Sequence, residues 1–427
     1  ANNFIQGLKE EKPKAYLSLT NINHYLKNYR FTKKTIEQDK IKEIYTFKTI
    51  SYFMDKNQLH ELHNGTLNNG VRKIGEIHRS LLYDVINSSS LFLKKQVDDS
   101  GKFRYGYFPA FNKEINTYNI LRHASTTYSM VEAFEVTDDP SLLDAIKRAI
   151  KYLVENAIEI VEVDGDKRAF VLEKEANNEI KLGANAHALL AMTKYTAVCN
   201  DYQYLEIMKL LAKGIEYFQN KENGSFVHVL NFPDLSVKDK FRTIYYDGEA
   251  AFALMRYFAL NEEEYWLHIV EKAMEYFIGN EYWKYGDHWM SYASNEMFRQ
   301  KPLPQYAQLN FKNVERKLDF CLTRETAYPT LLELLMASFN LYVYMEEKNL
   351  HNDILENVDL EKLQRAITHR TSHQLNSYFW PESAMYFKVP KNILNSFYIR
   401  HHSYRVRIDD IEHNISGYCN LLKFIKE

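Results

Sequence analysis

ASTTYSMVEAF (residues 124–134) and SLLDAIKRAIKYLVEN (residues 141–156) together predict a helical hairpin. The first stretch places apolar or small side chains on almost every side of a helix, which is typical of a helix buried all round. The second has apolar residues on one face and charged residues on the other, as a half-exposed helix does. Between them, Asp139 can cap the second helix and Pro140 can take its first position. We therefore expect an inner helix followed by an outer one.

The same pairing of an apolar with an amphipathic segment recurs along the chain. Apolar segments predict further inner helices at residues 183–198, 248–260, 288–298, 325–346 and 409–425. Amphipathic segments predict outer helices at residues 202–219, 262–278, 306–320 and 360–374, and residues 77–95 supply one more before the first inner helix. This alternation predicts an all-α fold, an (α/α)6 toroid of six helical hairpins with an inner and an outer layer, closed by pairing the two ends of the repeat.

Turn sequences connect the outer helices to the inner helices that follow them. Residues 99–103 (DSGKF), 164–165 (DG) and 222–226 (ENGSF) predict short β-hairpin loops. These loops should lie on the face of the ring where the inner helices start. That face is therefore the expected mouth of a pocket.

Two segments depart from the repeat. Residues 1–75 are expected to form an N-terminal extension that packs on the ring of residues 76–427, with helical periodicity at 15–30 and 40–53. Residues 379–406 predict a long loop or a strand excursion, because the prolines at 381 and 390 break a helix.

The bulk composition excludes several classes of protein. Hydrophobic residues make up 45% and charged residues 26%, which argues against disorder, and a formal net charge of −2 gives no global attraction to nucleic acid. The three cysteines, Cys199, Cys321 and Cys419, lack metal-ligand spacing, so neither a metal nor another cofactor is expected. No stretch reaches the roughly 18 consecutive apolar residues of a membrane span. The location is left open, with the cytoplasm favoured.

Polar residues gather at the start of each predicted inner helix, where the flanking sequence is apolar. If the ring closes, these clusters converge around one axis and can form a concave site. The candidates for catalysis are Asp247, Glu249, Asp287, His288, Asp409 and Asp410. The candidates for substrate binding are Tyr118, Arg122, His123, His187, Tyr246, Trp289, Arg324, Glu325, Tyr328 and Arg407.

Each candidate also has a structural interpretation. A carboxylate near a helix start is a good cap, and a histidine can be a hydrogen-bonded wall residue. An arginine at a helix start opposes the helix dipole, so Arg122, Arg324 and Arg407 need anionic partners. Those partners are either neighbouring carboxylates in a structural ion-pair ring or an acidic ligand group such as a uronate.

The organisation of residues 77–427, with the Asp/Asn-Gly turns and the stretch YYDGEA at 245–250, resembles the six-hairpin glycosidase superfamily. That superfamily includes unsaturated glucuronyl hydrolases, toroidal lyases and sugar epimerases. The resemblance implies a carbohydrate-active enzyme with an oligosaccharide or polysaccharide ligand. It is a repeat pattern rather than the motif of one subfamily, so no catalytic residue is carried over from it.

Three functions fit these observations. The leading hypothesis is a glycoside hydrolase acting on a bacterial glycan, neutral or acidic, because glycosidic hydrolysis needs paired carboxyl groups and the inner helices supply several. A uronate lyase or C5-epimerase would instead use a Tyr or His acid and base beside an arginine. A non-catalytic ring that binds a glycan or a protein is the third.

Overall fold

The computed structural model describes residues 5–6, 16–43, 45, 49–64, 68–326 and 328–425. The chain divides into two compact units, Ala1–Lys73 and Ile74–Glu427. The expected packing of the N-terminal extension on the ring stays a prediction.

The first unit contains a helix and a β-hairpin. The helix expected at 15–30 is confirmed as α1 (Leu19–Tyr29), whose first turn is capped by the side chain of Ser18. The helix expected at 40–53 is wrong where the chain is described, while residues 44 and 46–48 lie outside the described part. Its end belongs to β3 (Ser51–Asp55), which pairs with β4 (Gln58–Leu62). The reason is the tight turn at Lys56 and Asn57, which both adopt the positive φ that a two-residue hairpin requires.

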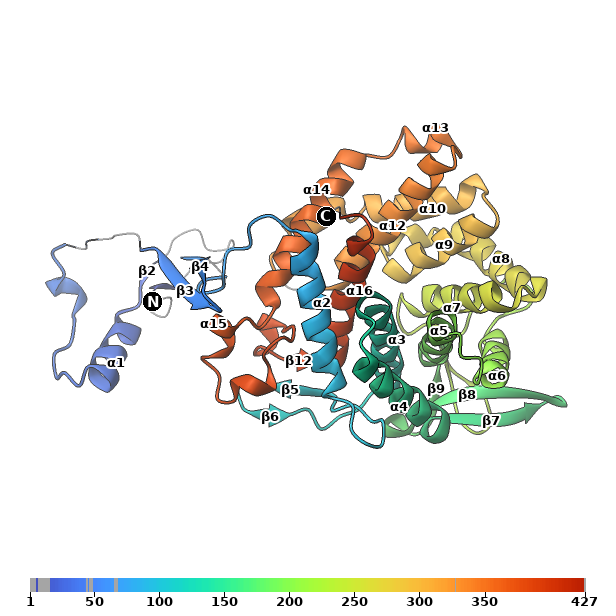
Figure 1. Ribbon diagram of the computed structural model, residues 1–427, viewed down its shortest axis with the longest axis horizontal. Helices are drawn as coiled ribbons and strands as arrows, with labels where there is room; N and C mark the ends of the chain where they lie inside the picture. The colour runs from blue at the N-terminus through green and yellow to red at the C-terminus, as the bar shows by residue number, and fades with distance from the viewer. Residues whose placement is uncertain are drawn as a thin grey trace. The chain divides into compact units, whose positions relative to one another are not determined.

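The second unit is a ring of inner helices enclosed by outer helices (Figure 1). Within the described residues the inner layer comprises α3 (Ile120–Thr137), α5 (Leu182–Cys199), α7 (Tyr246–Asn261), α9 (His288–Gln300), α12 (Thr330–Glu347) and α16 (Ile408–Leu422). Each inner helix packs on the next, and α16 packs back on α3, which closes the ring. The predicted (α/α)6 toroid is thereby confirmed.

The outer layer follows the predicted alternation. It comprises α2 (Arg79–Lys94), α4 (Pro140–Asn156), α6 (Leu205–Tyr217), α8 (Glu264–Gly279), α10 (Pro304–Glu315) and α14 (Leu360–Gln374). As predicted, α2 lies at the closure, where it packs on both α3 and α16, and Asp139 caps α4. Shorter helices are α11 (Leu318–Thr323), α13 (Asn352–Leu355) and α15 (Pro381–Ala384).

Local backbone chemistry sets the ends of these helices. The chain leaves α3, α5 and α7 through Asp138, Asn200 and Glu262, which adopt φ of 49°, 51° and 56° and so turn the chain toward the next outer helix. The inner helix expected from residue 325 instead begins at Thr330. Pro329 precedes it, and a proline disfavours the helical conformation in the residue before it.

Small antiparallel sheets lie near the starts of the inner helices. One contains β7 (Ile158–Val163), β8 (Asp166–Glu173), β9 (Glu179–Lys181), β10 (Val229–Leu230) and β11 (Val237–Asp239), and another contains β5 (Gly106–Phe108), β6 (Lys113–Glu114) and β12 (Val406–Arg407). The hairpin predicted at 164–165 joins β7 to β8. The other two predicted turns are closed by single bridges, Val97 to Phe103 and Gln219 to Phe226.

The segment 379–406 is mostly irregular, as expected. It nevertheless contains α15, whose first position is Pro381. Proline fits the first turn of a helix, where its missing N–H has no partner to lose, so it starts this helix instead of excluding one. Among the described helices, none combines the length and the apolarity that a membrane crossing requires.

The close approach of α6 to β8 depends on a glycine. A Cβ at Gly214 would lie 2.1 Å from the carbonyl oxygen of Ala169, a backbone atom that cannot move without shifting the strand. We predict that Gly214→Ala lowers the free energy of unfolding by about 1–3 kcal/mol, measured by urea denaturation. Gly279→Ala is the matched control, because a Cβ there meets nothing within 4 Å. Equal stabilities of the two variants would contradict the prediction.

Candidate functional site

A cavity of about 490 Å³ opens where the inner helices start. Its walls come from the first turns of these helices and from the segment that precedes α16. Of the predicted site residues, the cavity is lined by Arg122, His187, Tyr246, Glu249, His288, Trp289, Tyr328, Arg407, Asp409 and Asp410. The ring therefore brings together side chains that are up to about 290 positions apart in the sequence, as expected of residues that meet on the axis of a closed ring.

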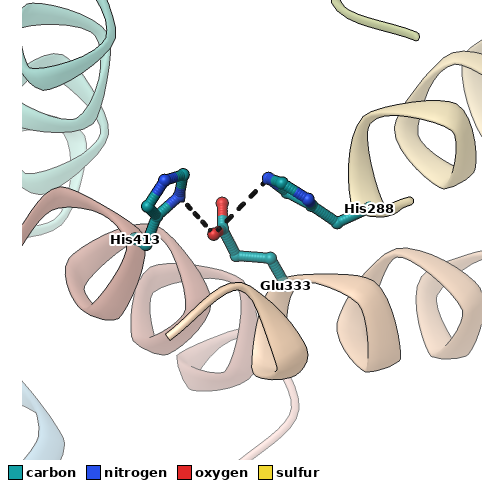
Figure 2. Close-up of side chains that lie close together, drawn as sticks. All are labelled: His288, Glu333 and His413. Atoms are coloured by element: carbon teal, nitrogen blue, oxygen red, sulfur yellow. Dashed lines mark hydrogen bonds and ion pairs between the residues drawn. The ribbon is translucent and has the colours of Figure 1, made fainter. Parts of the chain in front are cut away.

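His288 and His413 line the cavity, and a carboxylate lies between their imidazole rings (Figure 2). Glu333 of α12 accepts a hydrogen bond through Oε2 from Nδ1 of His413 on α16 at 2.7 Å. The same oxygen lies 3.9 Å from Nε2 of His288 on α9. The two rings meet edge to face with centroids 5.5 Å apart. Three inner helices thus bring one carboxylate and two imidazoles together.

The two histidines differ in their preferred charge. Burial lowers the pKa of His288 well below the ordinary range, and His413 and His187 lower it further. Burial also opposes a charge on His413, but the carboxylates of Glu333 and Glu412 outweigh it and raise its pKa to about 10. At neutral pH the site therefore holds a neutral imidazole beside an imidazolium, the arrangement expected of a base and an acid.

The same three side chains are a possible metal site, because their ligand atoms all lie within 4.8 Å of one another. Two imidazoles and a carboxylate suit zinc and non-haem iron. However, ligands about 2.0–2.1 Å from a tetrahedral metal stand about 3.3 Å apart, whereas His413 and Glu333 are 2.7 Å apart. A metal would have to open this hydrogen bond, so the geometry fits an ion pair better than a coordination shell.

Several polar atoms of the cavity wall are buried without a hydrogen-bond partner among the described residues. They are His187 Nδ1, Glu249 Oε2, His288 Nε2, Asp409 Oδ1 and Glu412 Oε2. A buried polar atom without a partner costs roughly 1–3 kcal/mol, and native proteins keep few of them. Their concentration around one cavity points to a polar ligand that both donates and accepts hydrogen bonds.

Arginines and aspartates form a second cluster on the wall. Asp409 forms ion pairs with Nε of Arg122 at 3.0 Å and with Nη2 of Arg407 at 2.9 Å. Asp410 accepts from both Arg405 and Arg407, each through Nε and Nη2. The ion-pair partners expected for Arg122 and Arg407 are therefore these aspartates.

The predicted catalytic residues Asp247 and Asp287 are not among the residues that line the cavity. Asp247 is buried and accepts a hydrogen bond from Nε2 of His228 at 2.9 Å, and His228 in turn accepts from the backbone N–H of Arg242. Asp287 caps α9 by accepting from the backbone N–H groups of Trp289 and Met290, each at 3.0 Å. Their positions are those of structural groups, and their catalytic roles stay predictions.

Four predicted binding residues also lie off the cavity wall: Tyr118, His123, Arg324 and Glu325. Nδ1 of His123 accepts a hydrogen bond from the hydroxyl group of Tyr118 at 2.7 Å, and its Nε2 donates one to the carbonyl group of Ala149. Burial lowers the pKa of His123 to about 4. Arg324 lies over the rings of Phe320 and Tyr328, and Glu325 is exposed.

Some residues of the site are not predicted from the sequence. Glu333 is one of them, because it follows the predicted start of its helix and has apolar neighbours in the sequence. A single charge in the stretch TLLELLMASF was the available signal, since an isolated buried carboxylate needs a partner. The cavity is also lined by Glu412, His413, Arg405, His401 and His402.

Solved structures share this architecture. A sugar epimerase from a ruminal bacterium superposes with a TM-score of 0.62 at 13% identity, covering 81% of this chain and 100% of that one. The cellobiose 2-epimerase of Bacillus thermoamylovorans B4167 gives 0.61 at 12%, covering 81% and 99%. The GH76A α-1,6-mannanase of Salegentibacter sp. HEL1_6 gives 0.56 at 13%, covering 80% and 99%. No family model and no curated protein matches the chain. The chain thus has the six-hairpin toroid fold of these proteins.

The charge of His413 is predicted to depend on Glu333. In Glu333→Gln the neutral amide no longer stabilises the imidazolium, so we expect the pKa of His413 to fall from about 10 toward the ordinary value. Titration of ¹⁵N-labelled histidine by NMR measures this, and His413→Gln assigns the signal by its loss. A pKa of His413 that is the same in the wild type and in Glu333→Gln would contradict the ion pair.

Proposed function

We propose that this chain is a carbohydrate-active enzyme that epimerises or isomerises a sugar by proton transfer at the carbon next to its carbonyl group. In this proposal His288 is the base and His413 is the acid. The observation that carries it is the pair of histidines of opposite charge preference, held face to edge on the axis of the ring.

The cavity wall supports a sugar as the ligand. A polyol presents hydroxyl groups that donate and accept, and these match the mixture of unpartnered atoms on His187, Glu249, His288 and Asp409. The rings of Trp289, Tyr245, Tyr246 and Tyr328 also reach the cavity, and aromatic faces suit the C–H faces of a sugar. Charged and aromatic groups together make a site for a small polar ring rather than for a lipid or a peptide core.

The chemistry follows from the two histidines. In an open-chain aldose, Nε2 of His288 takes the proton from C2, and the electron pair of that C–H bond forms the C1–C2 double bond. The carbonyl oxygen then receives a proton from His413, which gives a neutral enediol. For the epimer, the enediol turns its other face to protonated His288, which gives its proton back to C2, while neutral His413 takes the proton from O1 and the C1 carbonyl group forms again. For the ketose, His288 gives its proton to C1, while His413 takes the proton from the hydroxyl group on C2, which becomes the carbonyl group.

Glu333 and Glu412 support this assignment. Glu333 accepts from Nδ1 of His413, so the proton available to a ligand is on Nε2, which lies 3.5 Å from Oε1 of Glu412. A hydrogen-bonded carboxylate orients the ring and stabilises its charged form. The similar structures add support, because two of them are a sugar epimerase and a cellobiose 2-epimerase.

The proposal predicts exchange of a carbon-bound hydrogen with solvent. Mannose, glucose, N-acetylglucosamine, cellobiose and glucuronate are incubated with the protein in D2O, and NMR follows deuterium at C2. We expect exchange with at least one of these sugars and a loss of at least about 100-fold in His288→Asn and in His413→Asn. His268→Asn, an exposed histidine on α8, should exchange at the wild-type rate. Retained exchange in either site variant would remove that histidine from the mechanism.

The pH dependence of the same reaction has a defined sign. Activity needs neutral His288 and protonated His413. Activity should therefore be retained through neutral pH. It should fall as the pH rises through about 10, where His413 loses its proton. On the acidic side it should fall only below the ordinary pKa of a histidine, where His288 gains a proton. An optimum confined to pH values below 6 would contradict the assignment.

Glycoside hydrolysis is the second candidate, and one observation favours it. Burial raises the pKa of Glu412 to about 8, and a raised pKa is what a carboxyl group needs to act as a general acid. Glu249, with an unpartnered Oε2, is the available second carboxyl group.

The two candidates differ in their products. If the chain is a hydrolase, α-1,6-linked mannotriose or cellobiose should give monosaccharides, seen by chromatography, and Glu412→Gln should reduce the rate at least about 100-fold. Asp247→Asn and Asp287→Asn in the same assay test the roles predicted for those aspartates. Deuterium exchange without cleavage of either sugar would rule out hydrolysis in favour of proton transfer.

A further inference from the structure

Arg122, Arg405 and Arg407 form a cluster on the cavity wall that carries more positive charges than there are carboxylates paired with it. These guanidinium groups face two carboxylates, Asp409 and Asp410, among the described residues. Arginine stays protonated in proteins, so one positive charge is left over even when both aspartates are ionised.

The hydrogen-bond pattern leaves donors free as well as charge. Arg405 and Arg407 both use Nε and Nη2 on the aspartates, and within the described residues neither Nη1 has an acceptor. Arg122 uses Nε on Asp409 and Nη1 on the hydroxyl of Tyr105, which leaves Nη2. Each guanidinium group thus keeps one terminal nitrogen for a ligand.

The arginines are held firmly rather than left in solvent. The side chains of Arg405 and Arg407 are 15% and 17% exposed, and that of Arg122 is 33% exposed. All three line the cavity, together with an unpartnered buried oxygen, Oδ1 of Asp409. A guanidinium fixed by a carboxylate at one edge has already lost its rotamer entropy, so it can bind an anion at its other edge at little further cost.

The surroundings add hydrogen-bond donors without adding charge. His401 and His402 also line the cavity. Burial, and then the positive charges of Arg324 and Arg405, lower the pKa of His401; burial and Arg405 do the same for His402. Both imidazoles are therefore neutral at pH 7.5, and they can donate hydrogen bonds to an anion without any counter-charge of their own.

We infer that the sugar carries an anionic substituent, a carboxylate or a phosphate, which binds to the free edges of Arg122, Arg405 and Arg407 while a neighbouring hydroxyl donates to Asp409. The inference rests on the proposed function, since it takes the same cavity as the sugar site. It goes beyond that function by naming the substrate class as an acidic sugar. The shared chemistry is the anionic group, and a uronic acid and a sugar phosphate are its two sources.

The test compares matched sugars that differ in this group. Glucose, glucuronate and glucose 6-phosphate are titrated into the protein at pH 7.5, with binding followed by calorimetry and by the intrinsic tryptophan fluorescence, to which Trp289 of the cavity wall contributes. We expect glucuronate or glucose 6-phosphate to bind at least tenfold more tightly than glucose, and which of the two is tighter identifies the source. The affinity of the anionic sugar, but not of glucose, should fall as NaCl is raised.

Variants that remove one positive charge test whether the arginine cluster, and not the general charge of the protein, binds the anionic group. Arg405→Gln and Arg122→Gln should each reduce the preference for the anionic sugar at least fivefold, whereas Arg405→Lys should keep part of it. Arg365→Gln, which removes an exposed positive charge from α14, is the control and should leave the preference unchanged. Thermal melting confirms that each variant is folded, and the two glutamine variants remove the charge from different parts of the ring.

The outcomes for the two proposals are distinguishable. Glucose binding as tightly as both anionic sugars, or an anion preference untouched in both glutamine variants, overturns the acidic substrate. Deuterium exchange on neutral sugars alone would do the same while leaving the proposed reaction intact. If the protein prefers anionic sugars through these arginines but exchanges no carbon-bound hydrogen on any sugar, the anion site is supported and the proposed reaction is contradicted.

Discussion

The closure of α16 against α3 is the packing interaction on which the rest of the structure depends. An inner helix is apolar on almost every side, so it is stable in water only when neighbours cover both flanks and an outer helix covers its back. An open arc would leave two such flanks exposed. Closing the circle buries them and also gathers the helix starts around one axis, where polar side chains are removed from bulk water without being removed from one another.

This convergence of the helix starts explains why so many titratable side chains of the site have shifted pKa values. Burial alone would neutralise every one of them, because a charge is costly in a dry interior. Proximity then separates the histidines: Glu333, with Glu412 close by, raises the pKa of His413, whereas the neighbouring imidazoles of His413 and His187 lower that of His288. Asp409 and Asp410 stay paired with arginines instead. Two side chains of one residue type thus differ in charge because their neighbours differ.

The sequence could predict the features that depend on periodicity and on local turn chemistry. The alternation of apolar and amphipathic segments is a property of consecutive residues, and so it gave both layers and the partner of the last inner helix. Periodicity gave the wrong structure at Lys56 and Asn57, where a tight turn forms a hairpin instead of a helix. It also placed the start of α12 too early, because the helix begins only after Pro329.

The site was harder to predict because the direction of a side chain is set by tertiary packing. Asp247 and Glu249 stand two positions apart on α7; the first points to His228 and the second lines the cavity. Glu333 was missed for the same reason, since its partner His413 is 80 residues away along the chain. No window of the sequence shows that pair, which exists only once the circle is complete.

The order of helices along the polypeptide has a consequence for biosynthesis. The segment that carries Asp409, Asp410, Glu412 and His413 is the last inner helix to leave the ribosome, and it docks between α12 and α3, helices made long before it. A nascent chain, or a product of premature termination before residue 408, holds Glu333 and His288 but neither the imidazolium nor the aspartates that anchor the arginines. The cavity wall is therefore complete only after the α16 segment has been synthesised and has docked.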